Sequence, residues 1–522
     1  SPCFTILQDN YVTTSDGTGI VHMAPAHGED DYRVCSLYNI EPVCPLDMAG
    51  CFTDEAHDFK GMYLKDADKA IIAFLKQSTL LYHQDVIEHN YPFCPRSDTP
   101  LIYRTLPSWF VKVTAVKDKL TTHNQTINWL PEHIKNGRFG KWLEQAKDWA
   151  ISRNRYWGTP IPIWVNDVTQ KQICIDSISM LEKLSRTTVT DLHREHIDPI
   201  TFTIDGEPGI YRRIPEVLDC WFESGSMPFA QMHYPFENSD TFESMFPADF
   251  ISEGIDQTRG WFYTLTILSA CLFDKPAFKN ATVNGIIVAQ DGKKMSKRLK
   301  NYTPPDILME KQGADALRLY LIQSNLVRAE EMRFSDEGVM EMRRRVLLPW
   351  FNAYKFFETY STLDNWQPVD LPTSYENVLD QWITSRLQTL IKTVNEHMQT
   401  YALHGIVNQI CMFLDDLTNT YVRLNRSRFW SEDMTKDKHE AYSCLFCTLM
   451  QLGKLMAPFT PFLSESIYQK MRENSLIQDT DYISIHMHAY PQCNQDLQQP
   501  ILEDAVTLMQ SVLVLGRQAR ND

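Results

Sequence analysis

The spacing of apolar residues changes along the chain, and this change limits the folds that the chain can adopt. In the later part, apolar residues recur three or four positions apart, as on the buried face of a helix. Ile383, Leu387 and Leu390 begin one such series. We therefore predict a helical bundle over residues 341–500, followed by the start of a further region at 501–522.

The middle of the chain has a mixed pattern. Strand-like runs such as Ala248–Ile251 alternate with helical stretches such as Thr258–Leu272, which is typical of an α/β domain. We place this domain at residues 144–340, with an inserted subdomain at about 176–209. A single helix is expected over Pro305–Ile322.

Residues 1–143 combine short apolar-polar alternations with Gly, Asp and Pro turns, as in Thr18–Pro25. This pattern predicts a β-rich domain. At 522 residues, the chain is long enough for three or more domains, each with its own core. The expected fold class is multidomain α/β with a helical bundle.

Composition restricts the partners. A net charge of −16 argues against a protein that coats nucleic acid through a broad basic face, so an RNA partner would need local basic patches. Arg423, Arg426 and Arg428 form one candidate patch, which a solvated helix face explains equally well. No membrane or targeting segment is visible, the twelve scattered cysteines suit a reducing cytoplasm, and no metal site is predicted.

A KMSKR run at Lys294–Arg298 carries the clearest chemical signal. It places ammonium groups and a hydroxyl in a loop, with Gly292 before it and Pro304 after it. Such groups suit an enzyme that handles a triphosphate, because lysines reach polyphosphate as point charges. The alternative is a solvated basic turn.

Three further segments extend this signal. They are Asp148–Gly158, Leu218–Gly225 and Ser252–Phe262. Together with the KMSKR run, they resemble class I aminoacyl-tRNA synthetases, and in particular the isoleucyl enzymes of the eukaryotic cytoplasmic type. The resemblance implies a partial Rossmann-like catalytic core, a partial editing domain and an anticodon-binding bundle.

The resemblance also implies a site for the aminoacyl adenylate. Trp221 and Trp261 would otherwise be interpreted as core residues. The implied residues are Lys294, Ser296 and Lys297 for catalysis, Glu253, Gly254, Asp256, Gln257 and Lys297 for ATP and adenylate, and Trp221, Trp261 and Gln257 for the amino acid.

An editing site is implied by the segment Gly17–Tyr32. In similar enzymes, Asp31 would pair with the ammonium group of a misattached amino acid and His22 would lie near the terminal ribose. Judged singly, Asp31 could be a turn or cap residue and His22 an ordinary strand residue. Editing is expected because a pocket rejects a substrate that lacks one methylene by only about 1–3 kcal/mol, a limit established on this enzyme class.

The implied activity is ATP-dependent ligation of isoleucine to tRNA(Ile), with hydrolysis of mischarged Val-tRNA(Ile). ATP with Mg²⁺, isoleucine and the tRNA are the expected ligands, and the cytoplasm is the expected location. A His-Ile-Gly-His signature is absent, so we expect a fragment that lacks its N-terminal part. Its partner would be that missing half or a multi-synthetase assembly. A valyl or leucyl enzyme and a catalytically incomplete tRNA-binding fragment remain alternatives.

Overall fold

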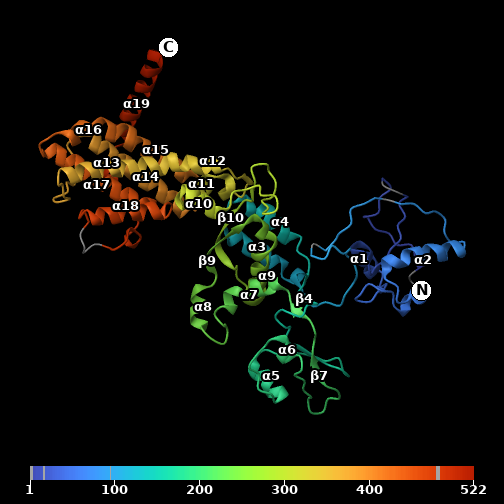
Figure 1. Cartoon of the computed structure of the whole chain (residues 1–522). Helices are drawn as coiled ribbons and strands as arrows, with labels where there is room; N and C mark the ends of the chain where they lie inside the picture. The colour runs from blue at the N-terminus through green and yellow to red at the C-terminus, as the bar shows by residue number, and fades with distance from the viewer. Residues whose placement is uncertain (1–3, 16–17, 87, 95, 478–481, 522) are drawn as a thin grey trace. The chain divides into compact units, whose positions relative to one another are not determined.

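The computed structural model describes residues 4–15, 18–86, 88–94, 96–477 and 482–521 (Figure 1). The chain divides into two compact units, Ser1–Trp109 and Phe110–Asp522. The first unit therefore ends well before residue 143, the boundary expected from the sequence. Residues 110–143 belong to the core of the second unit, where Trp129 is 2% exposed.

The first unit contains more helix than strand. Its helices are α1 (Glu29–Leu37), η2 (Asp54–Phe59) and α2 (Leu64–Gln77). Across its described residues, extended segments pair only through single bridges such as Leu46 with Phe52. The β-rich expectation is therefore not met, because alternation in a sequence indicates an extended segment but does not supply a neighbouring strand.

The α/β part of the second unit is organised around a parallel sheet with the strand order β2-β10-β9. These strands span Asn128–Leu130, Phe278–Asn284 and Ala248–Gly254. β10 pairs along its full length with β9, from Phe278 opposite Ala248 to Asn284 opposite Gly254. Parallel strands require crossover connections, and a helix in such a connection covers a face of the sheet.

Helices cover this sheet. The helix α9 (Trp261–Phe273) is apolar on nearly all sides and buries most of its residues, as expected of a helix inside a layered core. It packs against α7 (Cys220–Ala230) and α3 (Lys117–Thr126). The neighbouring elements are β1 (Phe110–Val111), η3 (Val113–Ala115), η4 (Lys135–Phe139), α4 (Gly140–Glu144), β3 (Trp149–Ala150), β4 (Ser152–Arg153), β8 (Val217–Leu218), α8 (Ser239–Met245) and η5 (Ile255–Arg259).

The inserted subdomain is larger than residues 176–209. It has its own core, in which Trp164 and Tyr211 are almost fully buried. Its strand order is β6-β5-β7. The elements are β5 (Ile163–Asn166), β6 (Gln172–Cys174), α5 (Ile178–Ser185), α6 (Arg194–Ile197) and β7 (Tyr211–Arg213).

The segment after the KMSKR loop forms two helices instead of one. α10 (Pro305–Gln312) and α11 (Ala314–Gln323) are separated by Gly313, whose φ of +87° lies outside the helical region. The remaining short elements here are β11 (Ile287–Val288), η6 (Asn325–Arg328) and β12 (Met332–Arg333).

The last part of the second unit is helical, as predicted. Its long helices α14 (Val378–Gln399) and α17 (Lys436–Met456) lie side by side (Figure 1). Asn377 and Thr435 cap their first turns with side-chain oxygens. The others are α12 (Asp336–Met342), η7 (Arg343–Leu347), α13 (Leu348–Leu363), η8 (Leu403–Gly405), α15 (Ile406–Asp415), η9 (Asp416–Val422), α16 (Arg423–Trp430), α18 (Pro461–Glu473), η10 (Ile485–Met487), η11 (Gln495–Leu497) and α19 (Pro500–Asn521).

Candidate functional site

The carboxyl ends of β9 and β10 bring two predicted segments to one edge of the sheet. Gly254 and Asn284 are opposite each other in the register, at the last residue of each strand. η5 follows β9 directly, and the KMSKR loop follows β10 after the short strand β11. This edge is where ligands bind in open parallel sheets.

A cavity of about 420 Å³ lies beside this edge. Trp221, Glu253, Gln257 and Trp261, which the sequence singled out, all line it. Ser224 and Met227 also line it and were missed. Ser224 lies three positions after Trp221 on α7, and Met227 lies three positions after Ser224, so successive i, i+3 spacing was the available signal.

Hydrogen bonds fix the polar side of the cavity. Gln257 accepts the backbone N–H of Trp261 through Oε1 at 2.9 Å and donates through Nε2 to Asp256 Oδ2 at 3.1 Å. The Trp261 indole donates to the Ser224 carbonyl at 2.8 Å. A Cβ at Gly260 would lie 2.6 Å from Gln257 Oε1 and 3.1 Å from the Trp221 ring, so a side chain here would displace the Gln257 carboxamide and crowd the Trp221 ring.

Glu253 contributes a carboxylate with no hydrogen-bond or ion-pair partner among the described residues, on a half-buried side chain. Hydrogen bonds on its buried side hold the neighbouring turn, η5, in place. Arg138 Nε donates to Thr258 Oγ1 at 3.0 Å, and that fully buried hydroxyl donates to the carbonyl of Ile255 at 2.7 Å. The turn therefore presents Asp256 and Gln257 from a fixed base, with Glu253 free to accept hydroxyl groups.

The KMSKR loop is exposed. Lys294 and Lys297 are exposed, whereas Ser296 is half-buried. The two lysine ammonium groups have no ion-pair or hydrogen-bond partner in the part of the chain that the structure describes. Unpaired cations at a ligand-binding edge can bind an anion without first breaking a salt bridge.

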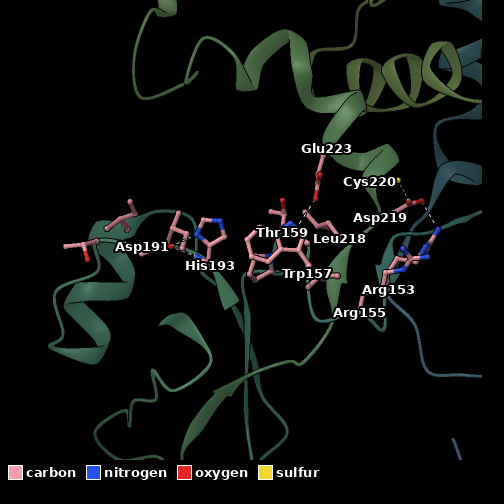
Figure 2. Close-up of a pocket in the computed structure, with 16 residues that line it drawn as sticks. Arg153, Arg155, Trp157, Thr159, Asp191, His193, Leu218, Asp219, Cys220 and Glu223 are labelled. Atoms are coloured by element: carbon pink, nitrogen blue, oxygen red, sulfur yellow. Dashed lines mark hydrogen bonds and ion pairs between the residues drawn. The ribbon is translucent and has the colours of Figure 1, made fainter. Parts of the chain in front are cut away.

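A larger cavity of about 840 Å³ lies between the α/β part of the second unit and the inserted subdomain. Figure 2 shows Asp191 and His193 at one end, Arg153 and Asp219 at the other, and Trp157 between them. Trp157 stacks on His193 with ring centroids 5.1 Å apart. Hydrogen bonds from the backbone and then the ring of His193 lower the pKa of Asp191. Asp219 caps α7 and accepts Arg153 Nη2 at 2.7 Å, so this pair is structural.

In the first unit, His22 is exposed and lines a cavity of about 740 Å³. Asp31 is not part of that lining. Its Oδ1 accepts the Tyr11 hydroxyl at 3.2 Å and its Oδ2 accepts the Ala24 N–H at 2.8 Å. Gly17, the first residue of the proposed editing segment, lies outside the described residues.

The three arginines of α16 differ in their surroundings. Arg423 and Arg426 are exposed and have no partner among the described residues. Arg428 donates through Nη1 and Nη2 to the two oxygens of Asp380, both at 2.9 Å, and its side chain is 10% exposed. Burial opposes its charge, but the hydrogen bonds that Arg428 donates to Asp380 and Asp437 outweigh burial and raise its pKa. This geometry fits a structural role for Arg428 better than an RNA contact.

Within the described residues, no group of three or more His, Cys, Asp or Glu side chains is placed to hold a metal ion. The same residues contain no helix that is long and apolar enough to cross a membrane.

Comparison with known proteins identifies the family. Residues 7–333 match the family described as tRNA synthetases class I (I, L, M and V). The chain belongs to this family. Residues 380–522 match the family described as the anticodon-binding domain of tRNA ligase, and this match falls largely on the helical bundle.

Isoleucine–tRNA ligases are among the curated proteins that this chain resembles. The chain is 49% identical to the cytoplasmic enzyme of Mus musculus, over 99% of the chain and 42% of that protein. It is also 49% identical to the enzyme of Chlamydia trachomatis, over 99% of the chain and 49% of that protein. The resemblance to isoleucyl enzymes is therefore confirmed. The chain spans about half the length of the curated relatives it matches.

Solved structures support the fold. A methionyl-tRNA synthetase of Mycobacterium tuberculosis bound by methionyl-adenylate aligns with a TM-score of 0.51 at 18% identity, covering 74% of this chain and 69% of that one. The catalytic part therefore has the class I synthetase fold, as the sequence predicted.

Proposed function

We propose that this synthetase takes part in joining isoleucine to tRNA(Ile), using ATP to form isoleucyl adenylate. One observation carries the proposal. At one edge of the parallel sheet, beside a tryptophan-lined cavity, lie lysines and a carboxylate that have no partner among the described residues. Similarity to isoleucine–tRNA ligases supports isoleucine as the amino acid.

In the first step, a carboxylate oxygen of isoleucine attacks the α-phosphorus of ATP, and pyrophosphate leaves as the P–O bond to the β-phosphate breaks. Lys297, with Lys294 and Ser296, would stabilise the charge that grows on the phosphates. Glu253 and Asp256 would accept hydrogen bonds from the ribose hydroxyls and the ammonium group. Gly254 would let the adenylate approach the backbone. Mg²⁺ would enter with ATP and neutralise part of the phosphate charge.

The amino acid would lie between Trp221 and Trp261, with Gln257 at the polar end. In the second step, a hydroxyl of the terminal ribose of tRNA(Ile) attacks the carbonyl carbon and AMP leaves. We assign phosphate contacts on the helical bundle to Arg423 and Arg426, because their guanidinium groups are exposed and unpaired among the described residues.

The first unit would hydrolyse Val-tRNA(Ile). His22 lines the cavity there, and Asp31 supports its wall through Ala24 and Tyr11. An ammonium group would have to compete with these two hydrogen bonds for Asp31. We further propose a cytoplasmic location, as in the mouse relative.

The test measures amino-acid-dependent exchange of pyrophosphate into ATP. The chain alone should give no exchange and should gain it when mixed with a matching N-terminal half, because the relatives are about twice as long. Isoleucine should be preferred over valine and leucine. Preference for valine or leucine would contradict the assignment of the substrate. Absence of exchange with a well-folded N-terminal half would favour a tRNA-binding role instead.

A further inference from the structure

The KMSKR loop concentrates positive charge without neutralising it. Five basic residues occur within eight positions, and their side chains are exposed with no ion-pair or hydrogen-bond partner among the described residues. They are Lys293, Lys294, Lys297, Arg298 and Lys300. Because like charges at this spacing repel one another, an unbraced loop would favour conformations that spread them apart.

One uncharged side chain braces the middle of this loop. Asn301 accepts the Ser296 N–H through Oδ1 at 3.0 Å and donates through Nδ2 to the Lys294 carbonyl at 3.2 Å. A carboxamide has both an acceptor and a donor, so it can hold both backbone groups at once. The Lys300 N–H closes the same turn by donating to the Ser296 carbonyl at 3.0 Å.

Other contacts hold only the ends of the loop. Before the basic run, Gly292 has a φ of +77° and closes a turn by donating its N–H to the Ala289 carbonyl at 2.8 Å. After the run, Thr303 Oγ1 donates to Asp336 Oδ2 at 2.7 Å, which ties the loop to α12. Among the described residues, Asn301 is the side chain that hydrogen-bonds to the backbone between Lys294 and Lys297.

We propose that Asn301 is a positioning residue that sets the directions of Lys294 and Lys297 toward the phosphates. This inference rests on the proposed function. By holding the peptide groups at residues 294 and 296, the carboxamide fixes the backbone from which both lysine side chains start. Small errors in the position of such groups cost large factors in rate, about 10²-fold for 1 Å.

The matched control is Asn280 on β10. It also makes one accepting and one donating hydrogen bond, from Asn128 Nδ2 at 3.0 Å and to the Asp249 carbonyl at 2.8 Å. It lies toward the opposite end of the strand, near Ala248, and away from the loop. N280A therefore also removes one accepted and one donated carboxamide hydrogen bond from the same domain, without changing a residue of the KMSKR segment.

The experiment compares N301A, N301D and N280A in the full-length protein. N301A should lower kcat for isoleucine-dependent ATP–pyrophosphate exchange about 10- to 100-fold, with an unchanged KM for isoleucine and an unchanged Tm. Tryptic cleavage at residues 293–300 should become several-fold faster. N301D keeps the acceptor but loses the donor, and its carboxylate would attract the lysines, so it should also lose activity. N280A should match wild type in kcat for exchange and in the rate of tryptic cleavage of the loop.

Three outcomes would overturn the inference. They are unchanged kcat in N301A, a loss of kcat with unchanged loop cleavage, and an equal loss in N280A. If wild-type protein gives no isoleucine-dependent exchange, the proposed function fails instead, and the comparison of cleavage rates still decides whether Asn301 braces the loop.

Discussion

The charged groups of the helical bundle and those of the KMSKR loop are arranged in opposite ways. In the bundle, Lys438 is 1% exposed and its Nζ lies 2.5 Å from Asp364 Oδ2, while Arg428 is enclosed by Asp380 and Asp437. In the loop, the lysines are exposed and unpaired among the described residues. A paired buried cation stabilises the fold but has no capacity left for a ligand, whereas an unpaired exposed cation has that capacity.

The comparison teaches that basic residues in a sequence cannot be assigned to RNA or phosphate binding by their charge alone. Arg426 and Arg428 are two positions apart on one helix, yet only Arg428 points to a buried carboxylate. The partners of each cation decide its role.

The largest expected effect is on the bundle. Asp380 is fully buried and also accepts the Tyr421 hydroxyl at 2.7 Å. D380A would leave Arg428 and Tyr421 without this partner, so we expect a loss of about 3–5 kcal/mol in the free energy of unfolding. Urea unfolding followed by circular dichroism measures it. D437A removes the exposed partner of the same arginine and should cost less than about 1 kcal/mol. Equal losses would contradict the distinction between buried and exposed pairs.

The next effect concerns the loop. K297A in the full-length protein should reduce adenylate formation about 10²- to 10³-fold, because it removes charge stabilisation of the leaving phosphates. Hydrolysis of Val-tRNA(Ile) should be spared. K300A removes an exposed lysine from the same loop and should change the exchange rate less than about threefold. Loss of both adenylate formation and Val-tRNA(Ile) hydrolysis in K297A would indicate a folding defect. It would contradict the distinction between loop lysines that bind phosphate and bundle cations that stabilise the fold.

A smaller effect is expected on α16. Replacing Arg423 and Arg426 together by alanine should weaken tRNA binding and reduce the slope of log affinity against log salt by about 1.4–1.8, if each arginine contacts one phosphate. Filter binding between low and moderate salt measures this slope. R428A should lower thermal stability without the same change in slope. An unchanged slope in the double variant would exclude this helix from the contact with RNA.

Local patterns predicted the elements of the bundle well. Ile383, Leu387 and Leu390 are all buried, because a 3.6-residue period places them on one face of α14. The KMSKR loop was found because its residue types carry the chemistry directly. Asn301 was missed because its role depends on the folded turn, although Asn in a turn that follows a basic run is a usable signal.

Non-local pairing explains what the sequence did not predict. Residues 110–143 were grouped with the first unit, but β2 pairs with β10 about 150 positions later. Nothing in the alternation of a short strand identifies a partner at that distance. The break at Gly313 was missed because a glycine inside a helical pattern can be tolerated, and only its φ of +87° shows that the helix ends.

The smallest expected effect is on the pH dependence of stability, which has opposite signs for two carboxylates. Asp315 on α11 is 4% exposed and accepts the backbone N–H groups of Phe462 and Leu463, at 3.4 and 2.8 Å. Burial raises the pKa of Asp315 despite these bonds. The native state therefore binds this proton more tightly than the unfolded chain, so the contribution of Asp315 to stability falls as pH rises from about 4 through its native pKa.

The measurement is the unfolding free energy of wild type minus that of D315N, taken from about pH 2 to 7 so that it spans both the raised and the lowered pKa. This difference should decrease as pH rises. D148N should behave in the opposite way, because hydrogen bonds from the backbone and hydroxyl of Thr114 lower the pKa of Asp148. Its contribution is present above about pH 4 and is lost as pH falls through the lower native pKa. If the unfolding free energy of wild type minus that of D315N grows with pH, the two backbone hydrogen bonds of Asp315 outweigh burial. Ionised Asp315 would then stabilise the fold, as the paired charges of the bundle do.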